Sequence, residues 1–191
     1  MGLRQEIPTH RPDLRRGELC GLEWKDVDFE HSLLHIRRSS LYIAGKGIFA
    51  DKTKNESSER CIKISSAAIE ALHEQRGWQL QERLKLGDVW QNTDRVFTRW
   101  DGRAIRPDSI TGWFHKFVTK NGLPPIHIHS LRHTYATLLI AAGTNLQTVA
   151  KRLGHANTTT TSKIYSHAIK SADEAAAETL QDILHPVKKQ A

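Results

Sequence analysis

Apolar side chains recur at helical spacing through the second half of the chain. The i, i+4, i+7, i+8, i+11 spacing of one helix face is met by Leu131, Tyr135, Leu138, Leu139 and Ala142. Ser130 is suited to cap the start of this helix and Gly143 to end it. A second helix is predicted to follow and to end at Gly154, with a face made by Leu146, Val149, Ala150 and Leu153.

Helices are also predicted in the first half. One is expected to begin near Pro12, because the first helical position tolerates the missing N–H of proline. Another is expected over Pro107–Lys120. A long helix is expected over Ser66–Leu84, with an apolar side that comprises Ala67, Ile69, Ala71, Leu72 and Leu80.

Three short runs have the character of strands: Leu33–Arg38, Leu41–Ala44 and Arg60–Ile64. Turns are predicted between them at Gly45–Gly47 and over the polar stretch Asp51–Glu59. The expected fold class is therefore α+β, mostly helical, with a small three-stranded antiparallel sheet near the N-terminus.

Composition indicates a globular protein with a polyanionic partner. Of the 191 residues 38% are hydrophobic, and no apolar run reaches the roughly 18 residues of a membrane span. The charge of +7 and the pI of about 9.6 favour nucleic acid, although a basic surface can also bind nothing in particular. The distant Cys20 and Cys61, and an N-terminus without a signal peptide's apolar region, indicate a cytoplasmic protein without disulfides.

Polar residues open the helix that contains Leu131. His129 and Arg132 are three positions apart, so both side chains can reach one place beside the positive end of the helix dipole. A guanidinium there can donate two parallel bonds to phosphate oxygens. Taken alone, the segment fits a helix cap with a surface ion pair slightly better than a phosphate site.

Other segments join this one in a fixed order. Leu14–Leu19, which contains Arg15, runs on into Leu22–Phe29, and Lys52 precedes the strand at Arg60. Downstream, a Leu-Gly-His triplet is followed ten residues later by a tyrosine. Together these residues resemble tyrosine recombinases of the phage integrase type, over almost the entire chain. The family's order Arg, Lys, His-x-x-Arg, His, Tyr is reproduced by Arg15, Lys52, His129, Arg132, His155 and Tyr165.

The resemblance implies a DNA strand transferase for site-specific recombination or integration, nucleoid-associated and encoded by a mobile genetic element. The DNA would be cut and rejoined through a 3′-phosphotyrosyl link at Tyr165, without ATP, metal or other cofactor. Arg15 and Arg132 would hold the non-bridging phosphate oxygens, and His155 would add a hydrogen bond.

The remaining roles implied by the family concern protons. Lys52 would protonate the departing 5′-oxygen. His129 would help to move the proton from Tyr165, whose phenol has an ordinary pKa near 10 and needs a positive field to become a nucleophile. Glu18 would help to orient its neighbours.

Partners and domains follow from the same resemblance. Double-stranded DNA is the expected partner, with self-association of the chain in a tetrameric synapse. Residues 1–170 are expected to form the catalytic domain. Residues 171–191 are expected to form a capped helix and tail, which packs either on its own core or on a neighbouring protomer.

Some features depart from the family. Asp13 stands where a small residue is usual, and Arg4 and Arg16 are weaker candidates for the first arginine. Only a short segment precedes Arg15, so a truncated or degenerate chain without an N-terminal clamp domain is expected. Two other functions remain open: a type IB topoisomerase and a non-catalytic DNA-binding remnant. A metal site at His127, His129 and His133 is disfavoured, since no acidic or cysteine ligand accompanies it.

Overall fold

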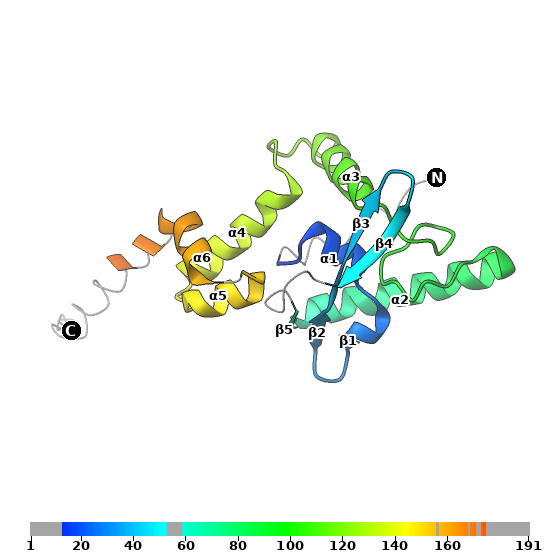
Figure 1. Ribbon diagram of the computed structural model, residues 1–191, viewed down its shortest axis with the longest axis horizontal. Helices are drawn as coiled ribbons and strands as arrows, with labels where there is room; N and C mark the ends of the chain where they lie inside the picture. Colours follow the sequence, from blue (N-terminus) through cyan, green and yellow to red (C-terminus); the bar gives the residue numbers. More distant parts are fainter. Residues whose placement is uncertain (1–12, 53–58, 156, 168, 171–172, 175–191) are drawn as a thin grey trace, which may run out of the picture. The chain divides into compact units, whose positions relative to one another are not determined.

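The computed structural model describes residues 13–52, 59–155, 157–167, 169–170 and 173–174, and the chain divides into two compact units, residues 1–132 and 133–191. The strands of the described chain lie in the first unit, together with its longest helix (Figure 1). The second unit is helical. The expected boundary between a domain over 1–170 and a tail over 171–191 stays a prediction.

An antiparallel sheet of three strands lies in the first unit. β1 (Val27–Asp28) pairs with β2 (Leu33–Ile36), and β2 pairs with β5 (Arg60–Lys63). Alternate residues of β2 and β5 are buried, as the period of a half-buried strand requires. The number of strands is as expected, but the membership differs, because the predicted strand Leu41–Ala44 pairs elsewhere and the two-residue β1 takes a place.

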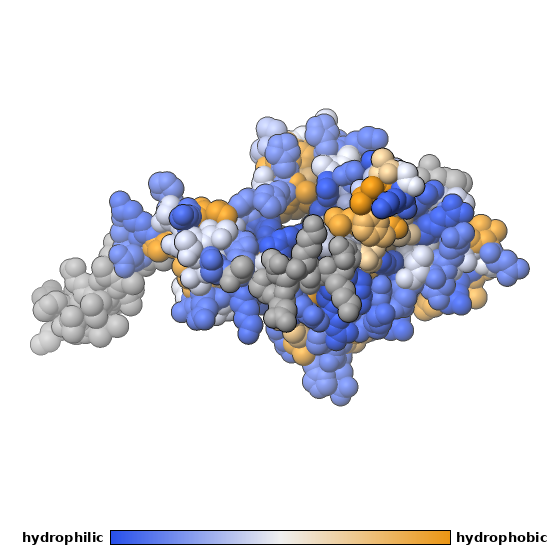
Figure 2. Space-filling model, in the orientation of Figure 1, coloured by the Kyte–Doolittle hydropathy of each residue, from blue (hydrophilic) through white to orange (hydrophobic). Residues whose placement is uncertain are grey.

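A separate hairpin follows this sheet's second strand. β3 (Arg38–Ile43) pairs with β4 (Gly47–Lys52), and its register runs from Arg38 opposite Lys52 to Ile43 opposite Gly47. The turn between the strands was predicted; β4 was not, because Gly47 was assigned to that turn and residues 51–52 to a second turn. Three large side chains of β3 are exposed, Leu41, Tyr42 and Ile43. Hydrophobic surface is visible in the region of this hairpin (Figure 2).

The long helix α2 (Ser66–Leu86) covers the predicted range, and the Ser65 hydroxyl accepts from the Ala68 amide at its start. Its buried residues are Ala68, Leu72, Gln75 and Gln79. Leu80, expected on the buried side, is 54% exposed. The stripe that packs inward ends in two glutamines, whose amides donate to the carbonyl oxygen of Val96 at 3.0 Å.

Two more helices complete the described part of the first unit. α1 (Arg16–Gly21) begins four residues after Pro12, where its start was expected, and leads into the 3-10 turn η1 (Trp24–Asp26). α3 (Pro107–Lys120) has the predicted bounds, and the 3-10 turn η3 (Gly87–Val89) follows α2. α1 and α3 both contact β3. The core between sheet and helices includes Leu19, Cys20, Leu34, Ile36, Leu72 and Ile110.

The second unit is built on the predicted helices. α4 (Ile128–Ala141) begins in the first unit and runs into the second, where α5 (Leu146–Leu153) and α6 (Thr158–Ile164) follow. Gly154 ends α5 with a φ of +63°, which glycine adopts at little cost. The core of this unit contains Ala136, Ile140, Val149, Leu153 and Tyr165.

Two sequence predictions can be compared only with the described residues. No described helix is both long and apolar enough to cross a membrane. The capped helix expected over residues 171–191 lies outside the described residues, apart from Asp173 and Glu174.

Candidate active site

Close contact with β3 fixes the position of α1, the helix that follows Arg15. Gly17 and Gly21 face the strand, four residues apart on one side of the helix. A Cβ atom at Gly21 would lie 3.0 Å from the carbonyl oxygen of Arg38 and 3.2 Å from the amide of Ser40. A Cβ atom at Gly17 would lie 3.0 Å from the Ser40 carbonyl. The absence of side chains at these two positions therefore lets the helix backbone approach the strand.

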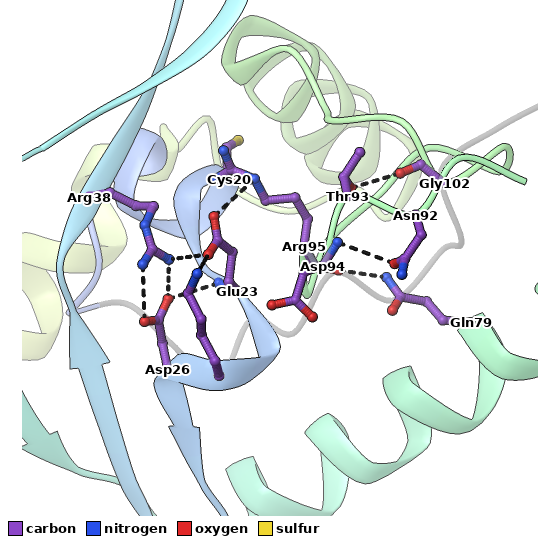
Figure 3. Close-up of polar contacts among 11 residues, drawn as sticks. Cys20, Glu23, Asp26, Arg38, Gln79, Asn92, Thr93, Asp94, Arg95 and Gly102 are labelled. Atoms are coloured by element: carbon purple, nitrogen blue, oxygen red, sulfur yellow. Dashed lines mark hydrogen bonds and ion pairs between the residues drawn. The ribbon is translucent and has the colours of Figure 1, made fainter.

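A network of charged side chains holds the chain that leaves α1 (Figure 3). The Arg38 guanidinium pairs with Asp26 and, at 3.0 Å, with Glu23. Arg95 donates to the carbonyl oxygen of Cys20 at 3.2 Å and lies 3.9 Å from the Glu23 carboxylate. Asp26 is almost completely buried, so its charge is compensated where water cannot reach it. The network links β3 and the segment at Arg95 to the end of α1.

Arg15 is the N-cap of α1 and is held by Glu18. Its Nη1 donates to Glu18 Oε1 at 2.9 Å, and its amide donates to Glu18 Oε2 at 2.8 Å. Glu18 is 3% exposed, whereas the Arg15 side chain is 41% exposed. The Arg15 side chain is thus anchored by Glu18 and still partly exposed to solvent, as a phosphate ligand needs.

A second arginine, Arg60 of β5, completes the partners of Glu18. It donates to both carboxylate oxygens, at 3.0 and 2.9 Å, and its own side chain is almost completely buried. Burial raises the pKa of Glu18, but the hydrogen bonds and charge of Arg60, together with those of Arg15, outweigh it, so the net pKa lies below the usual range. Glu18 is therefore an anion at neutral pH.

The main chain at Asp13 ties Arg132 to this cluster. The Arg132 guanidinium, buried like that of Arg60, donates to the Asp13 carbonyl oxygen, and Arg60 approaches the same oxygen at 3.5 Å. Because the acceptor is a backbone atom, the bond does not depend on which side chain stands at position 13. Arg15 and Arg132, 117 positions apart, are thus both connected to residues 13–18.

These residues surround a cavity of about 430 Å³ in the first unit. Its basic lining residues are Arg15, Arg16, His129 and Arg132, and its apolar lining includes Leu14, Leu41, Trp113, Phe114 and Leu131. Arg16 donates to Thr111 Oγ1 at 2.9 Å and pairs with Asp108 at 3.1 Å, so α3 engages it. The geometry brings together three of the six residues predicted for the site: Arg15, His129 and Arg132.

His129 is exposed in the first turn of α4. Ser130, predicted to precede that helix as its cap, lies inside it instead. Its hydroxyl accepts from the backbone N–H of His127 at 3.4 Å, so it still satisfies a donor at the helix start.

Tyr165 lies in the second unit, at the end of α6. Its ring is 5% exposed, and its hydroxyl oxygen is 3.0 Å from Nδ1 of His133 on α4. The ring centroids are 5.7 Å apart and the planes are inclined by 51°. His155, which follows α5, has its Nδ1 2.8 Å from Oγ1 of the buried Thr161. Both predicted residues of this unit are therefore oriented by hydrogen bonds.

Lys52 is the last residue of β4, opposite Arg38, and its side chain lies outside the described residues. The sequence did not single out Arg60 or His133 for the site. A charged residue at an inward position of a strand, followed by the buried Ile62, was the available signal for Arg60. In the described part of the chain, no group of three His, Cys, Asp or Glu side chains is arranged to hold a metal ion.

Comparison with known proteins adds three findings. The model of the phage integrase family matches residues 12–172. A tyrosine recombinase XerC-like protein of Caldanaerobacter subterraneus subsp. tengcongensis is 38% identical over 181 residues, which cover 89% of this chain and 46% of that protein. The ICEBs1 integrase of Bacillus subtilis is 30% identical over 174 residues, 90% of this chain and 46% of that protein.

A solved structure resembles this one closely. The Tn1549 transposon integrase, in complex with a circular intermediate DNA, matches with a TM-score of 0.73 and 26% identity, over 90% of this chain and 57% of that chain. The present chain spans about half the length of the relatives that it matches.

Proposed function

The chain belongs to the phage integrase family, and from that premise we propose that it carries the site at which a tyrosine recombinase cuts and rejoins DNA for recombination or integration. The family and the α+β, mostly helical fold expected from the sequence are confirmed. The observation that carries the proposal is the attachment of Arg15 and Arg132 to residues 13–18, beside a cavity that His129 also lines.

A pair of held guanidinium groups suits phosphoryl transfer. The transition state spreads negative charge over the non-bridging oxygens of the scissile phosphate. Donors that are already oriented stabilise that charge without reorganising during the reaction. Glu18 accepts from the guanidinium and the backbone N–H of Arg15, and the Asp13 carbonyl oxygen accepts from the Arg132 guanidinium. We assign Arg15 and Arg132 to the phosphate oxygens on this ground, with His155 as a further donor.

Tyr165 is the proposed nucleophile. Its phenol oxygen forms a bond to phosphorus while the bond from phosphorus to the 5′-oxygen breaks. Lys52 is the proposed acid that protonates the leaving oxygen. His129 is proposed to help move the proton away from the phenol. The resulting ester keeps the energy of the broken bond, so rejoining requires no ATP. The cationic side chains supply the charge that a metal ion would otherwise provide.

The charge distribution supports DNA as the substrate. Residues 109–172 contain seven Lys and Arg residues and no Asp or Glu. This range includes α4, α5 and α6, and four of the proposed site residues lie on or directly after these helices. A long segment without acidic groups attracts a phosphate backbone. The Tn1549 integrase named above was solved with DNA, and we extend that partner to this chain.

Recombination between two sites also requires more than one protomer. We propose that copies of this chain associate on DNA as a tetramer, and that residues 171–191 dock on a neighbouring protomer. The sequence pattern of that segment, a capped apolar helix, supports this role.

Covalent trapping tests the proposal. The chain is incubated in EDTA with a duplex that is nicked beside the cleavage point, so that the released fragment diffuses away. We expect a labelled protein–DNA band on a denaturing gel with the unaltered chain and none with Tyr165→Phe, at equal DNA binding. DNA binding without any covalent band would indicate a non-catalytic remnant. Relaxation of supercoiled plasmid at any sequence, without partner exchange, would indicate a topoisomerase.

A further inference from the structure

The partner of the Tyr165 hydroxyl group suggests a further residue for the reaction. We propose that His133 receives the phenolic proton of Tyr165 during attack, a role that rests on the proposed function. The phenol oxygen and Nδ1 of His133 are 3.0 Å apart, within hydrogen-bond distance, so His133 can take the proton directly, and the help proposed for His129 then comes after this first transfer.

The structure holds both partners of the contact, Tyr165 and His133, in place. Tyr165 donates its amide to the Thr161 carbonyl at 3.0 Å, and its own carbonyl accepts from the Ile169 amide at 3.1 Å. Its ring packs in a core with Ala136 and Leu153. His133 lies on α4, three residues before Ala136, so the same helix supplies both the packing and the acceptor. Backbone and core together keep the phenol oxygen beside Nδ1.

The helices α4, α5 and α6 carry no carboxylate that could compete for the phenolic proton. No carboxylate occurs in residues 109–172, so α4, α5 and α6 provide none to the phenol. The titratable groups on or next to α5 and α6 are Lys151, Arg152, His155, Lys163 and His167. The Arg152 Nε donates to the Tyr135 hydroxyl at 3.1 Å, and His155 contacts Thr161.

The proton transfer from Tyr165 to His133 accounts for every bond that forms and breaks. With the proton on Nε2, Nδ1 of neutral His133 accepts the O–H of Tyr165. As the bond from the phenol oxygen to phosphorus forms, the O–H bond breaks and Nδ1 gains the proton, so the ring becomes an imidazolium. The 5′-oxygen leaves with a proton from its own acid. In rejoining, the imidazolium returns its proton to the phenol.

The test compares substitutions at position 133 in single-turnover trapping on the nicked duplex, as a function of pH. His133→Asn keeps an oxygen acceptor close to the position of Nδ1 but cannot take up a proton. We expect trapping to slow by roughly 10²- to 10⁴-fold near neutral pH. We also expect loss of the rise in rate with pH that a titrating base confers. His31→Asn, on an exposed histidine of the β1–β2 turn, is the matched control and should change neither.

Each other outcome is decisive. Equal slowing at every pH would mean that His133 only orients Tyr165, and an unchanged rate would remove it from the reaction; either overturns the proposal and leaves the proposed function intact. If His133→Asn does not fold, as judged by thermal unfolding, His133→Phe keeps a ring against Tyr165 without an acceptor and should show the same loss.

A second measurement separates this proposal from the proposed function. Nitrogen NMR of the free protein reports which ring nitrogen of His133 carries the proton. We expect a bare Nδ1, with a resonance that shifts in Tyr165→Phe. A neutral ring protonated at Nδ1 would overturn the acceptor role whether or not the chain traps DNA. Absence of trapping with the unaltered chain, by contrast, would overturn the proposed function itself.

Discussion

Arg60 and Glu18 form a buried ion pair between β5 and α1, in which the guanidinium donates to both carboxylate oxygens at 3.0 and 2.9 Å. Glu18 also holds Arg15, and Arg60 approaches the Asp13 carbonyl that accepts from Arg132. The pair therefore lies between the two arginines proposed to bind phosphate, although it contacts no substrate itself. Its proposed contribution is to position them.

Breaking this pair from one side should destabilise the protein strongly. Arg60→Met leaves Glu18 buried with Arg15 as its remaining ionic partner, and loss of one partner of a buried pair costs about 3–5 kcal/mol. Urea unfolding gives the free energy of unfolding. The double variant Arg60→Met with Glu18→Leu should recover part of the loss, since no uncompensated charge remains. A single variant as stable as the parent would show that the pair does not hold α1.

The same pair makes stability depend on pH in the acid range. The folded pKa of Glu18 lies below its unfolded value of roughly 4.3. The unfolded chain therefore binds this proton first as pH falls. The stability from Glu18 is fully present above the unfolded pKa and is lost as pH falls through the folded pKa. Thermal unfolding of Glu18→Gln should show a weaker acid dependence than the parent in that window, and parallel curves would contradict the account.

Close approach of α1 to β3 predicts opposite results for two glycine substitutions. Gly21→Ala would place a Cβ atom 3.0 Å from a backbone oxygen, and such overpacking typically costs about 1–3 kcal/mol. Gly77→Ala, inside α2, meets nothing within 4 Å and should stabilise by about 0.5–1 kcal/mol through helix propensity. Denaturant unfolding gives the free energy of unfolding of both glycine variants. Equal effects would mean that α1 is not packed on β3 as described.

The two cysteines should differ sharply in reactivity. Cys20 is fully buried, and burial raises the pKa of its thiol to about 12, whereas Cys61 is exposed. The thiolate is the reactive form, so a disulfide reagent at neutral pH should label Cys61 quickly and Cys20 only after unfolding. Cys61→Ser should abolish the fast phase. A fast phase that survives this substitution would show that Cys20 is accessible.

Local patterns predicted the helices well, and long-range contacts explain what was missed. Gly154 ends α5 as expected because a left-handed C-cap is a local requirement. β4 was missed because both of its ends were assigned to turns, whereas its strand conformation depends on pairing with β3. Leu80 was placed inward by periodicity, but α2 turns Gln79 to the core, where Thr98 and the Val96 carbonyl accept from its amide.

The candidate site also contains residues that local motifs predict and residues that only long-range contacts reveal. The motif order identified Arg15, His129 and Arg132, which line one cavity. The motif order could not identify Arg60 or His133 as partners. Arg60 meets Glu18 across 42 positions, and His133 meets Tyr165 across 32. Such contacts depend on how helices and strands pack, and no local spacing encodes them.

Tyr165 is the residue expected to become covalently bonded to DNA, and the chain contains two other tyrosines as internal controls. The Tyr42 ring lies under the Arg106 guanidinium at 3.7 Å, and the Tyr135 hydroxyl accepts from Arg152. Neither tyrosine is a proposed nucleophile. Tyr42→Phe and Tyr135→Phe should therefore still trap DNA.

The most direct measurement is to digest the trapped protein–DNA complex with protease and nuclease and to locate the nucleotide by mass spectrometry. The account predicts that the added nucleotide mass falls on the peptide that contains Tyr165, joined through a 3′-phosphate, and that no such peptide forms in Tyr165→Phe. A nucleotide on Tyr42, on Tyr135 or on a residue other than tyrosine would contradict it.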